Sequence, residues 1–389
     1  MTTYFDRNYN ISFVEEETLP SNNLIIKHCL ASYIVYILIY FLLSTNPFFT
    51  NYFNPEMQKY YLICYVLYVI FAPVIYFIFR PKSLFRSHNL EIYTYFVNIF
   101  KQIFNKDTIF KKDYETVLKS FIPSYVQKQS LMLIFIKVFF GTLMFSFLLA
   151  NMHSIYFNIK NFILISHNFT SFIFLKSWII SKSERLYGFM ILLLFTVDLC
   201  PFVTGYLTEI SFLNNKIRTV DTNIMGIIFC LMCYPPFNNI TSNFLGWNQN
   251  NSVEMPDYAV LNWVFRIIGL CFLTIYAWAS VTLGFKASNL TNRGIVTKFP
   301  YNIVRHPAYI CKNIFWLFTT IQLIILNFTS GNYTFHESLL KSILIIISYL
   351  FWMMIYYFRA ITEERHLIQD PDYQEYVKKV RWRFIPHII

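Results

Sequence analysis

The sequence predicts an all-α fold, a polytopic bundle of transmembrane helices that ends in a helical hairpin. Of its 389 residues, 56% are hydrophobic and only 14% are charged, which is too apolar for an ordinary soluble domain. The apolar residues also gather in separate runs, several of them long enough to cross a bilayer, which takes about 20 residues. These two observations predict a multi-pass integral membrane protein with roughly seven to nine spanning helices.

The candidate spans follow one another along the chain and are separated by polar segments. One of them, 225–235, is short for a crossing helix and is therefore a candidate re-entrant segment. Two stretches near 155–180 are interrupted by polar residues and are candidates for the membrane interface. The candidate spans are 29–44, 60–79, 131–150, 187–206, 225–235, 260–285, 314–328 and 339–358.

Positive charge is concentrated in the segment 80–130. The net charge of the chain is +11, and this segment holds nine lysines and arginines against four acidic residues. Such an excess marks the cytoplasmic side of a membrane. Phe96, Phe100 and Phe104 lie among the lysines, as expected for an amphipathic helix on anionic membrane lipids. The flanking spans tether these charges to the bilayer, so we expect no nucleic acid as a partner.

The chain divides into two regions with different motif content. Residues 1–250 are rich in asparagine, phenylalanine and isoleucine and contain no constellation of catalytic residue types, so no role is predicted for them. Residues 255–389 contain a span, a polar loop with the sequence Arg-His-Pro, two further spans and a basic tail. The boundary between the regions falls within 238–257, a polar stretch with many asparagines.

The last two candidate spans are joined by the segment 327–337, which contains the turn-forming Gly331. They are therefore expected to form an antiparallel helical hairpin, which returns the chain to the side on which it started. The end of the second helix, 359–366, should then face the loop that contains Arg305 and His306.

The charged residues at this end of the hairpin have the chemistry of a binding site. Arg359 and Glu363 are four residues apart, so they project from one face of a helix. Arginine presents a planar fork that suits a carboxylate or phosphate, and a glutamate suits an ammonium group or ribose hydroxyls. His306 precedes Pro307, and proline is favoured in the first turn of a helix, where free amides suit a polar ligand. The alternative is a plain ion pair between Arg359 and Glu363, with His306 capping a helix.

Two motifs in 255–389 resemble the signatures of one enzyme family. The run from Asn292 to Tyr309, Asn-Arg-Gly-Ile-Val-Thr-Lys-Phe-Pro-Tyr-Asn-Ile-Val-Arg-His-Pro-Ala-Tyr, resembles the signature of the isoprenylcysteine carboxyl methyltransferase family and is similar to that of the related membrane phospholipid methyltransferases. The second signature is an arginine four residues before a Glu-Glu pair, followed by Tyr-x-x-Tyr and a terminal proline. The residues that match it are Arg359, Glu363, Glu364, Tyr373, Tyr376 and Pro386.

The resemblance implies that 255–389 is a membrane methyltransferase domain whose cofactor is S-adenosylmethionine, held in a pocket at the cytoplasmic face. The nine glycines of the chain agree with this, because they form no Gly-x-Gly loop of a dinucleotide-binding domain. Arg359 would hold the methyl acceptor, and Arg359 and His306 would be the catalytic residues; no metal is implied. The cofactor-binding residues implied by position are Lys286, Arg293, Gly294, Ile295, Val296, Tyr301, His306, Pro307, Ala308, Tyr309 and Glu363.

The chain departs from the family pattern in several places. Phe299-Pro300 stands where the family usually has a glycine before the first tyrosine, and Cys311 stands where glycine is frequent. The usual Phe-Gly ahead of the Tyr-x-x-Tyr becomes Asp-Pro-Asp at 370–372. Because glycines permit backbone conformations that other residues rarely adopt, we expect the loop shape and the acceptor fit to differ from those of the family.

The membrane setting favours a lipophilic acceptor that enters from the bilayer, while the cofactor arrives from the cytoplasm. An ionised carboxylate needs no general base, whereas an amine would have to be deprotonated, with His306 or Glu364 as the candidate base. Carboxylate methylation is therefore favoured. Two alternatives stay open: a membrane lipid or sterol-type reductase that uses NADPH, and a non-enzymatic transporter or scaffold.

Further charged residues lie in or near the candidate spans, where ionisable groups are by default functional candidates. Arg266 and Asp198 are a candidate structural pair, and Lys137 lies in another span. Lys341 is near enough to a span end to extend its ammonium group to the interface.

Overall fold

A computed structural model describes most residues of the chain. Within them the fold is all-α, apart from one two-residue strand pair, which confirms the predicted fold class. The described residues are 19–50, 52–81, 84–85, 87–104, 122–166, 183–207, 209, 213, 215–238, 253 and 255–388.

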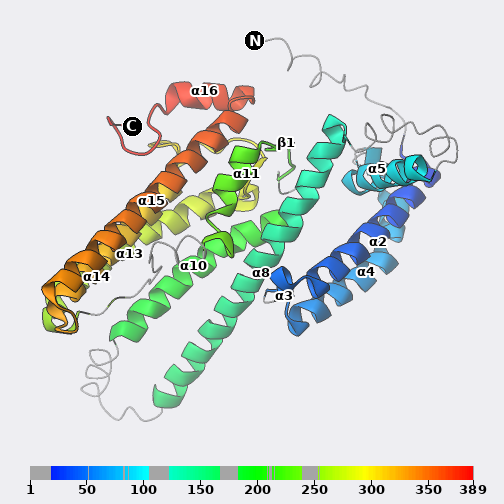
Figure 1. Cartoon of the computed structure of the whole chain (residues 1–389). Helices are drawn as coiled ribbons and strands as arrows, with labels where there is room; N and C mark the ends of the chain where they lie inside the picture. Colours follow the sequence, from blue (N-terminus) through cyan, green and yellow to red (C-terminus); the bar gives the residue numbers. More distant parts are fainter. Residues whose placement is uncertain are drawn as a thin grey trace. The chain divides into compact units, whose positions relative to one another are not determined.

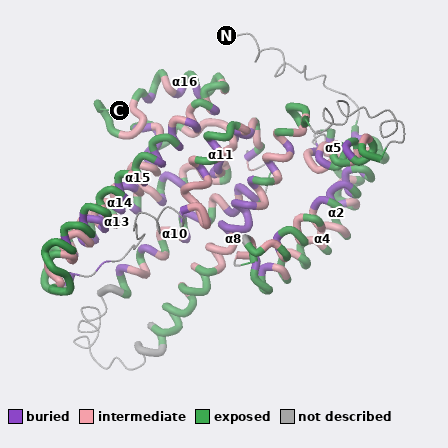
Figure 2. Tube along the Cα trace, viewed as in Figure 1, coloured by how far each residue is buried: buried purple, intermediate pink, exposed green. Residues whose placement is uncertain are grey.

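Seven helices of the described part are long and apolar enough to cross a membrane. They correspond to seven of the predicted spans, so the multi-pass architecture is confirmed. Their outer faces are largely exposed, as helices facing lipid require (Figure 2). The seven are α2 (Asn22–Thr45), α4 (Pro55–Phe79), α8 (Tyr125–Ser166, apolar over Tyr125–Asn161), α10 (Ser183–Leu207), α13 (Ala259–Leu283), α14 (Pro307–Thr329) and α15 (Phe335–Leu367).

The remaining predicted segments are shorter or only partly described. The candidate re-entrant segment 225–235 overlaps the helix α11 (Ile224–Leu231), whose 8 residues are too few to cross a bilayer. Helix α8 continues to Ser166, and the rest of the candidate interfacial stretch lies outside the described residues.

The chain forms two compact units, Met1–Ile134 and Phe135–Ile389. The second unit contains all of 255–389 together with α10 and α11. The predicted regional boundary at 238–257 lies mostly outside the described residues and stays a prediction.

The first unit contains α2, α4, the single turn α3 (Pro47–Thr50) and α5 (His88–Ile103). Tyr61 on α4 donates a hydrogen bond of 2.7 Å to the carbonyl of Tyr36 on α2, which joins the two spans. Helix α5 is amphipathic, because Ile92 and Ile99 are buried whereas the polar residues Thr94, Asn98 and Lys101 are exposed. This agrees with the amphipathic helix predicted within 80–130, although 105–121 lies outside the described residues.

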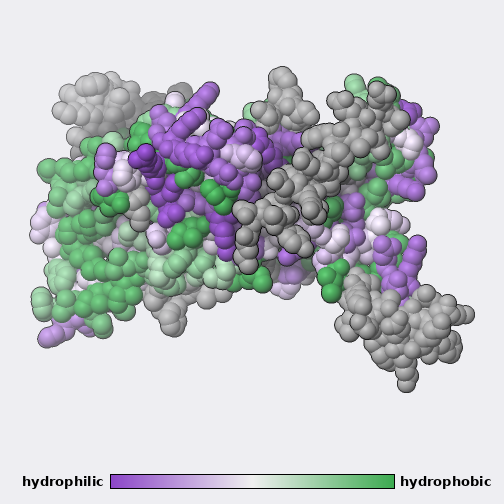
Figure 3. Space-filling view, turned by 90° about the horizontal axis from the view of Figure 1, so that it is seen from above, coloured by the Kyte–Doolittle hydropathy of each residue, from purple (hydrophilic) through white to green (hydrophobic). Residues whose placement is uncertain are grey.

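The core of the second unit lies between α10, α13, α14 and α15, which pack in sequence order. Leu273, Phe315 and Trp352 form the centre of this core and are each at most 1% exposed. Figure 1 shows α14 and α15 side by side along their length. On the face drawn in Figure 3, hydrophobic residues cover broad areas of the surface, and hydrophilic residues gather in other areas.

The predicted C-terminal hairpin is present, and its turn is shorter than expected. Helix α14 ends at Thr329, and Gly331 in the turn has φ +69°, a conformation that glycine adopts without steric cost. Helix α15 then begins with a capping box, in which Thr334 and Glu337 each bond the backbone N–H of the other.

Short elements surround the end of the hairpin where α14 begins and α15 ends. Strand β1 (Thr219–Val220) pairs antiparallel with β2 (Thr291–Asn292), with Thr219 opposite Asn292. Helix α11 packs against α15. The other short elements are the 3-10 turns η3 (Pro256–Tyr258) and η4 (Gly284–Lys286) and the helix α16 (Pro371–Lys379).

Candidate functional site

The hairpin brings the two predicted polar clusters into contact. His306, the residue before the first turn of α14, places its Nε2 atom 3.0 Å from Glu364 Oε1 near the end of α15. Arg305 Nε lies 2.9 Å from the same oxygen. The predicted meeting of the Arg-His-Pro loop with the charged end of α15 is therefore confirmed.

The C-terminal tail is attached to the same cluster. The amide of Arg305 donates to the carbonyl of Trp382 at 2.9 Å, and the amide of His306 donates to the carbonyl of Arg383 at 3.0 Å. The Arg383 guanidinium in turn donates to Glu364 Oε2 at 2.8 Å. Glu364 thus connects the loop, α15 and the tail, and its carboxylate is already paired with cations.

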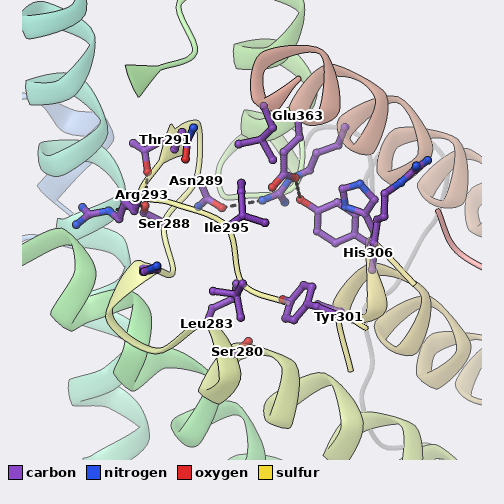
Figure 4. A pocket seen from close by; sticks show the side chains of 18 of the residues that line it. Ser280, Leu283, Ser288, Asn289, Thr291, Arg293, Ile295, Tyr301, His306 and Glu363 are labelled. Carbon is purple, nitrogen blue, oxygen red and sulfur yellow. Dashed lines mark hydrogen bonds between the residues drawn. The ribbon is translucent and has the colours of Figure 1, made fainter. Parts of the chain in front are cut away.

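A cavity of about 170 Å³ opens beside this cluster. Glu363 faces it from α15, whereas Leu283 and Ser280 face it from α13, and Ile295 projects between them (Figure 4). Of the residues implied by the family resemblance, all except Pro307 line this cavity. The lining ones are Lys286, Arg293, Gly294, Ile295, Val296, Tyr301, His306, Ala308, Tyr309, Arg359 and Glu363.

Glu363 and Arg359 use the same helix face but have different partners. Glu363 Oε2 accepts a hydrogen bond of 2.6 Å from the Tyr309 hydroxyl, and the Tyr309 ring stacks on the His306 ring with centroids 5.1 Å apart. Among the described residues, no ion pair joins Arg359 to Glu363. The alternative of a plain Arg359–Glu363 ion pair is therefore wrong.

The Arg359 side chain is buried and held among aromatic rings. Its Nη2 donates to Asn289 Oδ1 at 2.7 Å. Its guanidinium carbon lies 5.1 Å from the centroid of Tyr309, 5.5 Å from that of Tyr234 and 6.0 Å from that of Tyr356. Such rings attract a cation, and they fix the plane of the guanidinium at the cavity wall.

Asn289 is a site residue that the sequence did not reveal. Besides accepting from Arg359, it donates through its backbone N–H to the Tyr206 hydroxyl at 2.7 Å and through Nδ2 to the Tyr234 hydroxyl at 3.1 Å. Asn289 thus connects three parts of the unit, namely α10, α15 and the segment that follows α11. A single amide in a chain rich in asparagine carries no spacing signal, so only the structure identifies it.

The Arg293 side chain stabilises the fold, because its guanidinium forms hydrogen bonds within the protein. Its guanidinium donates to the carbonyl oxygens of Gly205 and Asn215 at 2.6 Å and 2.5 Å and to Ser288 Oγ at 2.8 Å. Since these bonds occupy all three nitrogens, a contribution of Arg293 to ligand binding would come from its main chain.

The next residue, Gly294, has φ +92°, and its amide donates to Asn292 Oδ1 at 2.8 Å. An added Cβ at this position would lie 3.1 Å from Arg218 Nη2 and 3.2 Å from Lys286 Nζ. Both the backbone conformation and the two neighbouring cations therefore favour glycine at this point of the cavity wall.

The segment 370–372, which departs from the family pattern, is bonded to Asn292, in the segment that leads to Gly294, and to Arg218. Asp370 Oδ2 accepts from Asn292 Nδ2 at 2.6 Å and from Arg218 Nη1 at 2.9 Å, and Arg218 Nη1 also lies 2.6 Å from Asp372 Oδ2. Burial opposes ionisation of Asp370, but the hydrogen bonds from Asn292 and Arg218 outweigh it and hold the pKa of Asp370 below its ordinary value.

The Tyr-x-x-Tyr motif supports the cavity floor. Tyr373 and Tyr376 are buried on α16 and pack against Tyr301 and Ala279. The Tyr376 hydroxyl donates to the carbonyl of Tyr301 at 2.6 Å. The motif therefore fixes the position of Tyr301, a predicted cofactor contact.

Two charged residues inside the membrane-spanning helices have partners other than those predicted. Asp198 accepts hydrogen bonds from Tyr276, at 2.6 Å, and from Ser280, so its predicted pairing with Arg266 is wrong. Arg266 instead donates to the carbonyl of Val253 at 3.0 Å, in a separate part of the bundle. The Arg266 guanidinium lies 4.8 Å from the ring centroid of Tyr187, and Asp198 is 11 residues further along α10, or about 16 Å.

Two other charges in the spans also have local partners. Lys137 pairs with Glu209 at 3.2 Å, and Lys341 Nζ lies 3.2 Å from the ring centroid of Tyr333. Neither residue lines the cavity.

The arrangement joins cations, aromatic rings and Glu363 around a single cavity at the end of the hairpin. Within the described residues, only Oε2 of Glu363 accepts a hydrogen bond, which leaves Oε1 available to a ligand. This set can bind a zwitterionic or cationic small molecule next to an anionic one. No protein-family model matches the chain, and no curated protein or solved structure matches it either.

Proposed function

We propose that the protein is an integral membrane methyltransferase that uses S-adenosylmethionine and acts on a lipophilic acceptor resident in the bilayer. One observation carries the proposal. The two motifs that resemble the isoprenylcysteine carboxyl methyltransferase family are separated along the chain, yet their residues line one cavity. A plain structural role for the motifs does not require a shared cavity.

The residues of the cavity fit the chemistry of this cofactor. Glu363 offers a carboxylate oxygen to an ammonium group or to ribose hydroxyls, and Lys286 offers a cation to a carboxylate. The stacked His306 and Tyr309 rings offer an aromatic face, and such faces attract cations such as a sulfonium. S-adenosylmethionine, when bound, supplies an electrophilic methyl group.

Arg359 is the proposed acceptor-binding residue. Its guanidinium is oriented by Asn289 and by the surrounding rings, so a carboxylate acceptor would meet a fixed fork of N–H donors. Methyl transfer depends mainly on how the nucleophile is positioned. An ionised carboxylate also needs no base, which agrees with the commitment of Glu364 to Arg305, His306 and Arg383.

The length of α15 supports a cavity near the membrane surface. The helix has 33 residues, or about 50 Å, and a hydrocarbon core is only about 30 Å thick. If Phe335 lies at one surface, Arg359 and Glu363 lie near the opposite one, where a lipophilic acceptor and a water-soluble cofactor can both arrive. The basic tail that follows α16 favours the cytoplasmic side for this end.

The test is to incubate the purified protein with methyl-labelled S-adenosylmethionine and a native lipid extract, and to identify the labelled product. The proposal predicts label in a lipophilic product and, for a carboxylate acceptor, its release by mild alkali, which hydrolyses methyl esters. Binding of a nicotinamide dinucleotide without binding of S-adenosylmethionine would contradict the proposal.

A further inference from the structure

We propose that Lys312 is a specificity-determining residue of this cavity, which binds the anionic head of the acceptor together with Arg359. The inference rests on the proposed function and adds a residue that neither of the two motifs contains as a functional position. It concerns the membrane-side wall of the cavity, where α10, α13 and α14 meet.

Lys312 lines the cavity and is surrounded by aromatic rings. Its Nζ lies 5.1 Å from the ring centroid of Trp316, 5.3 Å from that of Tyr276 and 6.0 Å from that of Phe195. Among the described residues, none forms a hydrogen bond or ion pair with this ammonium group. Its three N–H donors therefore remain available to a molecule in the cavity.

The nearest carboxylate is committed elsewhere. Asp198 is 6% exposed and accepts hydrogen bonds from Tyr276 and Ser280. It lies more than 4.0 Å from Lys312 Nζ, since no salt bridge is formed. Asp198 thus lowers the cost of a cation in the bundle without occupying the donors of Lys312.

The position of Lys312 also argues against an interfacial role. It is the sixth residue of α14, about 8 Å along the axis from Pro307. A lysine near a helix end normally extends its ammonium to the interface, but the ammonium of Lys312 stays among rings of the bundle interior. An ammonium retained inside a spanning bundle, without a paired carboxylate, is expected to have a functional partner.

Lys312 and Arg359 are linked through adjacent rings. Lys312 contacts Trp316, Arg359 contacts Tyr356, and the Trp316 and Tyr356 centroids are 5.9 Å apart. Both cations line the same cavity. An acceptor anion would meet two cations there, whereas a protonated amine would be repelled by both.

The inference is tested with two single-chain probes of equal length, radiolabelled hexadecanoate and hexadecylamine, and with the full-length protein in lipid nanodiscs. Binding is measured for the wild type, Lys312→Met, Lys312→Arg and the control Lys341→Met, and uptake by empty nanodiscs is subtracted. Lys341 is the matched control because it lies in a spanning helix against an aromatic ring but outside the cavity. Binding of S-adenosylmethionine is measured on the same samples.

We expect Lys312→Met to weaken hexadecanoate binding about tenfold, because one charge-assisted hydrogen bond is lost. Lys312→Arg and Lys341→Met should stay near the wild type, and hexadecylamine binding should not weaken in Lys312→Met. Cofactor binding should be unchanged in all variants, which confirms that they are folded.

Equal hexadecanoate binding by the wild type, Lys312→Met and Lys341→Met, with cofactor binding intact, would overturn the role of Lys312 and leave the proposed function standing. Failure of the wild type to bind S-adenosylmethionine would instead overturn the proposed function. If Lys312→Met misfolds and loses cofactor binding, the inference is tested on the wild type alone. Equal affinity of the wild type for hexadecanoate and hexadecylamine would contradict it.

Discussion

At the scale of single residues, the site depends on how buried polar groups are shared among partners. Arg359 and Glu363 are neighbours on one helix face, yet Arg359 is bonded to Asn289 and Glu363 to Tyr309. Because each has its own partner, they can face different ligands.

Replacing Asn289 with alanine is expected to lower the free energy of unfolding by about 1–3 kcal/mol, because the buried Arg359 guanidinium loses its acceptor. Thermal unfolding of the detergent-solubilised protein measures the change as a lower Tm. Asn332→Ala is the control, since Asn332 lies exposed in the hairpin turn and its side chain forms no bond to the described residues. Equal melting temperatures for the two variants would contradict the role given to Asn289.

The residues that the sequence did not reveal are those without a partner at a fixed spacing. Arg359 and Glu363 are four residues apart on a predicted helix, and such a spacing is readable from the sequence. The roles of Asn289 and Lys312 depend instead on hydroxyl groups and aromatic rings that other helices contribute. Tertiary packing, which no local pattern encodes, decides their roles.

At the scale of elements, the end of the hairpin is joined to the C-terminal tail by the Glu364 carboxylate and by two backbone hydrogen bonds. The Glu364 side chain is 12% exposed and is shared by Arg305, His306 and Arg383. Removing one member of such a network leaves charges buried without a partner, which destabilises a protein strongly. The tail is thus attached to the charged cluster beside the cavity.

Substituting Glu364 with glutamine is expected to release the tail locally. The amides of Arg305 and His306, which donate to carbonyls of the tail, should exchange with solvent about tenfold faster or more. Hydrogen exchange followed by mass spectrometry measures this rate. The control is Glu337→Gln at the opposite end of α15. Unchanged protection of the peptide containing Arg305 and His306 would rule out the clamp.

The contact between Asp370 and Arg218 is expected to weaken only in acid. The pKa of Asp370 is lowered in the folded protein, so its contribution to stability is present above about pH 4, the ordinary value. That contribution is lost as the pH falls through the lowered folded value. The wild type should therefore lose more Tm than Asp370→Asn between about pH 5 and pH 3. Arg218→Gln should behave like Asp370→Asn, and parallel curves for the wild type and Asp370→Asn would exclude this contribution.

Elements with a strong periodic or apolar signal were predictable, and their partners were less so. The hairpin follows from two long spans and a short turn with Gly331, which leaves one simple geometry. The pairing of Asp198 with Arg266 failed because nearby hydroxyls satisfy Asp198 before any distant cation can. Sequence gives the charge of a residue but not which neutral groups lie next to it.

At the scale of the whole molecule, the length of α15 separates the two ends of the hairpin. The hairpin turn and α16 lie at opposite ends of α15, and this helix is longer than a bilayer core is thick. The turn and the cavity should therefore lie on opposite sides.

Single cysteines at Asn332 and Gln374, in a chain whose native cysteines are replaced by alanine, test this sidedness. Both positions are exposed, one in the turn and one on α16. A membrane-impermeant maleimide should label Gln374→Cys only from the cytoplasmic side and Asn332→Cys only from the other side. Labelling of both from one side would contradict the proposed topology.

The central claim is that the cavity at the end of the hairpin binds S-adenosylmethionine through Glu363 and the acceptor through Arg359. Isothermal titration of the purified protein with S-adenosylmethionine tests it most directly, using Glu363→Gln and Arg359→Lys, two conservative changes four residues apart on one helix. The account predicts that Glu363→Gln weakens cofactor binding about tenfold or more, whereas Arg359→Lys changes it by less than about threefold. Equal cofactor affinity in the wild type and Glu363→Gln, or no binding by the wild type, would contradict the account.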